Sequence, residues 1–122
     1  MTDEPPFKPV IWVGSSRKDL REFPDLVQDH IGYALYVAQQ GGKHRDAKPL
    51  RGFGGAAVVE IVTDFDGNTF RAIYTVRFAG AVYVLHVFQK KSKKGRATPK
   101  IEMNLIEQRL REAERIARGE RR

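Results

Sequence analysis

The cations near the end of the chain are the residues best suited to chemistry in this sequence. Six of them lie between His86 and Lys100, with no acid among them: Lys90, Lys91, Lys93, Lys94, Arg96 and Lys100. This window contributes six of the seven net positive charges of the chain. A positive field concentrated in one segment attracts a polyanion through phosphate contacts and counterion release. Taken alone, the window fits a polyanion-binding segment and a solvated loop equally well.

Two arginines are predicted to lie beside this window. If Thr69–Phe78 alternates as a strand, Arg71 and Arg77 point to the side opposite the apolar residues. Lys90 and Lys91 end the following strand, so we expect the four cations to converge on one exposed sheet face. The side chain of Arg71 should then be removable without loss of the fold.

Such a cluster suits the cleavage of RNA by its own 2′-hydroxyl. That reaction requires a proton acceptor, a proton donor and cations that stabilise the charge of the phosphorane. Neighbouring positive charges lower the pKa of a lysine and make its neutral amine accessible, whereas an arginine stays cationic. The alternative is that the same groups only bind phosphate.

Other kinds of site are less well supported. The three histidines, His30, His44 and His86, are not spaced for one helical face, and the chain has no cysteine, so we expect neither a metal site nor a cofactor. His86 lies in an alternating strand, which favours a partly buried, hydrogen-bonded imidazole. The glycines of 52–55 lack the lysine of a phosphate-binding loop and are expected to form a turn.

Composition and length predict one cytoplasmic domain. The chain has 122 residues, of which 41% are hydrophobic and 30% charged, values typical of a folded protein with a single core. No apolar run approaches the ~18 residues of a membrane span, and the N-terminus, 1–8, does not have the basic and then apolar pattern of an export signal. We expect a single domain over 1–122, with a core of about 8–117.

The pattern of apolar residues predicts an α+β fold. We expect a strand over 9–13, a short helix capped by Ser16 and a second, amphipathic helix that begins at Pro24 and ends at Gly41. A loop should follow to residue 55. Three antiparallel strands are then expected as a meander, over 57–62, 69–78 and 81–89, with a turn at 66–68. A final helix should begin after Thr98 and Pro99 and run to about residue 119, burying Met103, Ile106, Leu110, Ala113 and Ala117.

Three sequence motifs are informative beside the pattern of elements. They are Leu50-Arg51-Gly52, Phe70-Arg71-Ala72-Ile73-Tyr74, and residues 85–94, which end in Phe-Gln-Lys-Lys-Ser-Lys-Lys and lead to Thr98-Pro99. With the order of elements, they resemble the RelE/HigB toxin superfamily, in its phage-derived, HigB-like branch. The resemblance covers about residues 8 to 117. It implies an N-terminal strand and an αα-hairpin packed on the meander, with the C-terminal helix beside them.

The resemblance also implies a function. Members are ribosome-dependent, metal-independent endoribonucleases that cut translated messenger RNA and are neutralised by a co-expressed antitoxin, here expected to be a helix-turn-helix protein. It assigns Arg71 to the reactive phosphate and Lys91 to a second basic position of the site, with Lys90 and His86 as further catalytic candidates. The residues expected to bind RNA or the ribosome are Arg51, Arg77, Lys93, Lys94 and Arg96.

The resemblance does not assign the general base to one residue. Well-studied members carry lysines on the second strand, whereas 58–62 of this chain reads Val-Val-Glu-Ile-Val, with Glu60 as its one ionisable residue. They also place a tyrosine where this chain has 96–98, Arg-Ala-Thr. The candidates for the base are therefore Lys90, His86 and Glu60, in that order.

Two other classes of function compete with the ribonuclease. A non-catalytic or ParE-like inhibitory module would share the fold, but such relatives generally lack a dense basic cluster. A DNA-binding protein is less well supported, because no helix-turn-helix pair follows the basic window and the last helix alternates in charge.

Overall fold

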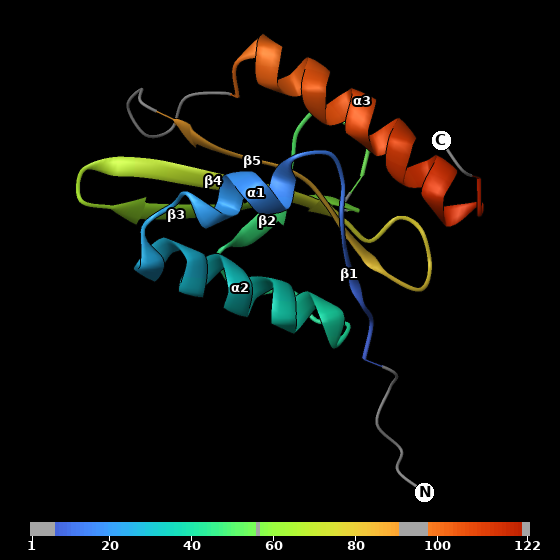
Figure 1. The fold of residues 1–122 in the computed structure, drawn as a ribbon, viewed down its shortest axis with the longest axis horizontal. Coiled ribbons are helices and arrows are strands. Elements are labelled where there is room, and N and C mark those ends of the chain that lie inside the picture. The colour runs from blue at the N-terminus through green and yellow to red at the C-terminus, as the bar shows by residue number, and fades with distance from the viewer. Residues whose placement is uncertain (1–6, 56, 91–97, 121–122) are drawn as a thin grey trace, which may run out of the picture.

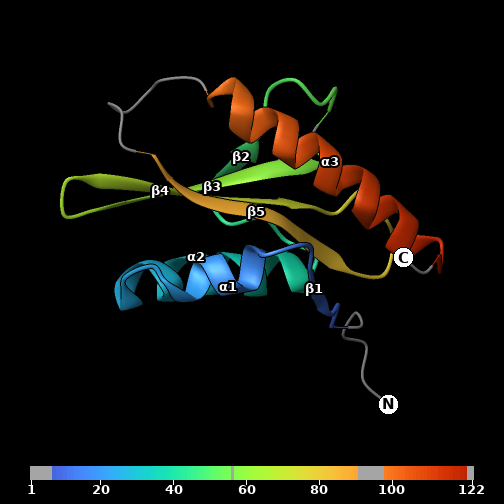
Figure 2. The same cartoon turned by 45° about the horizontal axis from the view of Figure 1, so that its top comes forward.

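A five-stranded sheet lies between two helical layers, as Figures 1 and 2 show. The computed structural model describes residues 7–55, 57–90 and 98–120. In chain order the elements are β1 (Val10–Trp12), α1 (Ser16–Arg21), α2 (Asp25–Gln39), β2 (Ala47–Pro49), β3 (Val58–Phe65), β4 (Asn68–Thr75), β5 (Val82–Lys90) and α3 (Lys100–Ala117). Helices α1 and α2 cover one face of the sheet, and α3 crosses the other. The predicted α+β class and order of helices are thereby confirmed.

The sheet has the strand order β1-β5-β4-β3-β2. Strands β3, β4 and β5 form the expected antiparallel meander, and β1 adds to its edge parallel to β5. At the opposite edge β2 pairs with residues 59–61 of β3. The register of β4 and β5 shifts after Ile73, which pairs with His86, because Tyr74 pairs with Val84. This β-bulge places Leu85 and His86 on the same face of the sheet.

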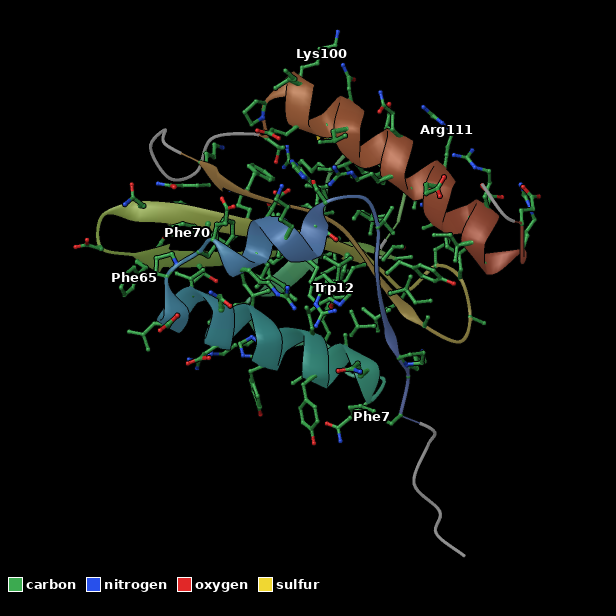
Figure 3. The ribbon with its side chains drawn as sticks, viewed as in Figure 1. Phe7, Trp12, Phe65, Phe70, Lys100 and Arg111 are labelled. Atoms are coloured by element: carbon green, nitrogen blue, oxygen red, sulfur yellow. The ribbon has the colours of Figure 1, made fainter. Side chains whose placement is uncertain are left out.

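Each face of the sheet has its own apolar core. Toward α1 and α2 the sheet buries a cluster that includes Ile61, Ala72, Tyr74 and Val84. Figure 3 shows Phe70, Phe65 and Trp12 on this side, and the ring of Phe70 lies 4.8 Å from that of Phe23. Toward α3 the buried cluster consists of Val13, Leu50, Val58, Ile73, Ala81, Tyr83, Leu85, Phe88, Ile106 and Ala113.

The helices follow their apolar spacing. In α2, the residues Val27, Ile31, Ala34, Leu35 and Ala38 are all buried, as predicted from their repeat of three and four. The helix ends before Gly41, whose φ of +89° favours glycine. In α3, Ile106 and Ala113 are buried and Met103, Leu110 and Ile116 pack against the core. The expected burial of Ala117 is wrong, because Ile116 takes the place on the inner face and Ala117 is exposed.

Four details differ from the prediction. Residues 47–49 were expected within a loop but form β2, and β4 ends at Thr75 rather than at residue 78. The first helix has Ser15 as its N-cap, and the hydroxyl of Ser16 instead donates to the backbone oxygen of Val84. The largest difference concerns the sheet face that carries Arg71: α3 lies on that face, and the side chain is buried. None of the described helices is long and apolar enough to cross a membrane.

Candidate functional site

Five ionisable strand residues lie on the α3 side of the sheet, near the β3–β4 hairpin: Glu60, Asp64, Arg71, His86 and Lys90. They occupy three successive cross-strand rows: His86 with Ile73 and Glu60, then Phe88 with Arg71 and Val62, then Lys90 with Thr69 and Asp64. Directly opposed residues share a face of the sheet, and so do alternate residues along a strand. We call the set Glu60, Arg71, His86 and Lys90 the polar patch. In Figure 1 the end of β5, which carries Lys90, lies beside this hairpin.

Arg71 is a buried, ion-paired member of the polar patch. Its side chain is 8% exposed, and its Nη1 donates to Oε2 of Glu60, which is 13% exposed. The two residues are diagonal neighbours on β4 and β3, which suits a long side chain reaching across strands. Within the described residues, the buried Nε of Arg71 meets no hydrogen-bond acceptor. The site therefore holds a cation that is oriented by a carboxylate and retains one donor for another acceptor.

Lys90 ends β5 and is buried, with 5% of its surface exposed. Its partner across the strands is Thr69, and its diagonal neighbour is Arg71. Diagonal neighbours in an antiparallel sheet are typically about 7–8 Å apart. The prediction that Arg71 and Lys90 lie together is confirmed. Both sit on regular strands, which hold side chains more firmly than loops do.

His86 contacts α3 with both of its ring nitrogens. Nε2 lies 2.7 Å from Oε1 of Glu102, and Nδ1 lies 3.4 Å from Nη1 of Arg109. The imidazole stacks on Phe88, with ring centroids 5.0 Å apart. The predicted hydrogen bonding of this histidine is confirmed, and the residue is more deeply buried than expected, with 6% of its surface exposed. With both nitrogens directed to α3, His86 is placed to hold that helix on the sheet.

Arg109 completes the attachment of α3. Its guanidinium donates to the backbone oxygen of Leu85 at 3.0 Å and to Oγ of Ser15 at 3.1 Å, and it lies so close to Gly14 that a Cβ there would be 2.6 Å from Nε. Burial lowers the pKa of Arg109, and the carboxylate of Asp19 partly opposes that shift. One side chain thus joins α3 to β5 and to the segment before α1.

The other predicted cations do not all join the polar patch. Arg77 lies beyond the end of β4, six residues from Arg71, or about 20 Å along an extended chain. It is exposed, and its Nη2 donates to the backbone oxygen of Phe53. The expected convergence of Arg77 with Lys90 is therefore wrong, because the strand places them at opposite ends of the sheet. Arg51 is exposed on the turn after β2, next to Gly52, which faces Met103 of α3.

Part of the predicted site lies outside the described residues. This applies to Lys91, Lys93, Lys94 and Arg96. Their assigned roles stay predictions.

Two residues of this region escaped the sequence analysis. Lys48 of β2 is exposed and lies directly opposite Glu60, so it extends the row of His86, Ile73 and Glu60 to the sheet edge. It was missed because residues 41–55 show no periodicity. Glu102 of α3 is the second: its carboxylate pairs with His86 across 16 residues. No local signal relates a helix residue to a particular strand residue.

A second polar cluster lies elsewhere on the sheet. His30, His44 and Asp46 bring one possible ligand atom each to within 4.8 Å of one another. The expectation of no metal site was based on the spacing of histidines along one helix. That spacing does not test for this cluster, because His30 comes from α2 and the other two residues come from the segment before β2.

Comparison with known proteins assigns the chain to a family. The model of the family described as phage-derived protein Gp49-like (DUF891) matches residues 18–111, most of the chain. The chain belongs to this family. The family match confirms the predicted phage-derived branch. No curated protein matches this Gp49-like chain.

Among solved structures, this Gp49-like chain is similar to a chain of the toxin–antitoxin complex RelBE2 from Mycobacterium tuberculosis. The identity is 20% over 70% of this chain and 93% of that chain, with a TM-score of 0.46.

Proposed function

We propose that this Gp49-like protein is the toxin of a toxin–antitoxin pair, and that it acts in the cytoplasm as a ribosome-dependent endoribonuclease on messenger RNA. The observation that carries the proposal is the guanidinium of Arg71, held on a rigid strand by Glu60 with its Nε donor unused among the described residues. A phosphate oxygen is the acceptor that a preorganised guanidinium suits best. The basic residues of 90–100 agree with a nucleic-acid substrate.

Cleavage would proceed by attack of the 2′-hydroxyl on the adjacent phosphate. Arg71 would stabilise the negative charge that grows on the phosphorane, and Lys90, its diagonal neighbour, would supply a second cation or the proton for the leaving 5′-oxygen. Glu60 would orient Arg71, and its carboxylate would be the candidate acceptor for the proton that the 2′-hydroxyl loses on attack. Among the three candidates for the base, the contacts of His86 with α3 favour a structural role for that residue.

The burial of Arg71 places a condition on this mechanism. With 8% of the side chain exposed, a phosphate can reach the guanidinium only after part of its cover moves. We expect this movement to accompany binding to the ribosome, which would keep the free protein inactive on naked RNA. The proposed partner is a small helix-turn-helix antitoxin that would cover the basic surface or displace α3.

The experiment is expression of the chain alone, together with cleavage of messenger RNA on translating ribosomes. We expect growth arrest, cleavage within the decoding site and no cleavage of naked RNA. The variant R71K keeps the charge but loses the planar donor pair, so it should retain the fold and lose cleavage. Growth arrest without any RNA cleavage would instead support a non-catalytic, ParE-like inhibitor of another protein.

A further inference from the structure

The cluster of His30, His44 and Asp46 lies on the side of the sheet that faces α2, away from the polar patch. Nε2 of His30 is 2.8 Å from Oδ2 of Asp46, and Nδ1 of His44 is 3.8 Å from the same oxygen. The residues come from two elements of the chain: His30 from the middle of α2, and the other two from the segment that leads into β2. The fold therefore assembles two imidazoles and a carboxylate at one point.

These separations match the coordination of a small transition-metal ion. Zinc binds histidine nitrogen at about 2.0–2.1 Å and carboxylate oxygen at about 2.0–2.2 Å, so the ligand atoms of a tetrahedral site lie roughly 3.3–3.5 Å apart. The separations of 2.8 Å and 3.8 Å fall on either side of that value, and all three ligand atoms lie within 4.8 Å of one another. An ion would therefore have to adjust the positions of the side chains but would not require a new arrangement of the backbone elements. Two histidines with one carboxylate are also a donor set that zinc, cobalt and nickel accept.

The groups around the cluster already orient its ligands. Nδ1 of His30 is hydrogen-bonded to Oγ1 of Thr63, which leaves Nε2 directed at Asp46. The ring of His44 lies edge-on to that of His30, at 5.3 Å, and to that of Tyr33, at 5.6 Å. A hydrogen bond to the distal nitrogen is the usual support of a metal-bound histidine.

The third ligand, Asp46, is a carboxylate that lies next to both imidazoles, and a carboxylate oxygen is a ligand that zinc accepts. Nδ1 of His44 accepts a hydrogen bond from the amide of Asp46 at 3.0 Å, and a metal at that nitrogen would replace this bond. The change would be confined to the short segment that carries both residues.

The cluster is accessible from solvent and borders a pocket. The side chains of His30, His44 and Asp46 are 28%, 13% and 42% exposed. A pocket of about 420 Å³ is lined by His30 and Asp46 together with Leu26, Val27 and Val62–Phe65. Residues 62–65 of β3 extend past the last residue that β2 pairs with. A metal ion held by three protein ligands would thus keep a fourth position open toward the pocket.

We propose that His30, His44 and Asp46 form a binding site for one divalent transition-metal ion, with zinc as the physiological class, and with water in the open fourth position. The ion would fasten the segment between α2 and β2 to α2, and through Thr63 to β3. The site lies on the other side of the sheet from Arg71 and has no part in the proposed cleavage. A failure of the proposed function would therefore not contradict the metal site, and the reverse is also true.

The test is a titration of the untagged full chain with cobalt chloride, followed by displacement with zinc chloride. Cobalt in a tetrahedral site with nitrogen ligands gives visible d–d absorption, which reports the geometry as well as the stoichiometry. We expect one ion per chain, loss of the absorption when zinc is added, and a higher melting temperature with zinc because the ion binds only the folded state. T63V should weaken binding by about 10-fold, as loss of a group that supports a ligand does.

Variants of the ligands decide the assignment. H44Q and D46N change partly exposed side chains and should fold normally by circular dichroism, yet bind cobalt at least about 100-fold more weakly. D29N is the matched control: it removes a carboxylate from the exposed side of α2 and should leave the affinity unchanged. Absence of saturable binding up to about 1 mM, or equal affinity in H44Q, D46N and the wild type, would overturn the proposal and leave the cluster as a hydrogen-bonded attachment of the loop.

Discussion

Removal of the Arg71 side chain should unfold the protein more easily as well as abolish its activity. Because the side chains of Arg71 and Glu60 are 8% and 13% exposed, R71A leaves a carboxylate in the interior without its cation. Breaking a buried ion pair on one side costs about 3–5 kcal/mol, and we take about 3 kcal/mol because Glu60 keeps some contact with solvent. For a domain of this size, that loss corresponds to a fall in melting temperature of roughly 10–15 °C.

The measurement is thermal and urea unfolding of the wild type, R71A, E60L and the double variant R71M/E60L. Replacement of both partners by apolar residues of similar size is often neutral, so the double variant should recover most of the stability that R71A loses. A loss below about 1 kcal/mol in R71A, or a double variant as unstable as the sum of the single losses, would refute the description of this pair. R71K retains the charge beside Glu60 and should be as stable as the wild type. Its cleavage activity can therefore be compared directly with that of the wild type.

Three further outcomes are expected. E102Q weakens the contact with His86, so it should lower the free energy of unfolding by about 1–2 kcal/mol. The rate of amide hydrogen exchange should rise more in α3 than in β4. Burial raises the pKa of Tyr74 to about 12, whereas the phenol of the unfolded chain ionises near pH 10. The free energy of unfolding should therefore fall by about 2 kcal/mol between pH 10 and 12, and Y74F should reduce this loss in urea titrations at alkaline pH. K48A changes an exposed side chain opposite Glu60, and it should leave the melting temperature unchanged while it lowers the salt slope of RNA binding by about one unit, whereas an unchanged slope would exclude Lys48 from the RNA-binding surface.

The sequence was sufficient for the order of all elements except β2, but not for what covers the sheet. Apolar spacing located both long helices, and alternation located the three strands of the meander. Alternation also placed Arg71 opposite the apolar side chains of β4, but it could not show that α3 packs over that face. The inference that Arg71 is exposed was wrong because a strand in a three-layer fold is buried on both faces, whatever its pattern of polar residues.

The candidate site depended on register, which sequence does not supply. Arg71 and Lys90 meet because β4 and β5 pair in a register that makes them diagonal neighbours. Arg77 fails to join them because it lies six residues from Arg71, past the opposite end of β4. The contacts of His86 with Glu102 and of His30 with Asp46 join residues that are 16 positions apart through the folding of separate elements. Residue types indicated which groups could take part, and the tertiary structure decided which of them meet.

The most direct test of a catalytic polar patch is single-turnover cleavage of messenger RNA on programmed ribosomes, at saturating protein, for K90A and K100A. The two variants remove the same charge from the same basic window, but Lys90 is buried beside Arg71, whereas Lys100 is exposed on α3 and points away from the sheet in Figure 3. The mechanism predicts that K90A cleaves about 100-fold more slowly at saturation and that K100A cleaves at the wild-type rate with slightly weaker binding. Equal rates at saturation for K90A, K100A and the wild type would contradict it and would make the patch a docking surface.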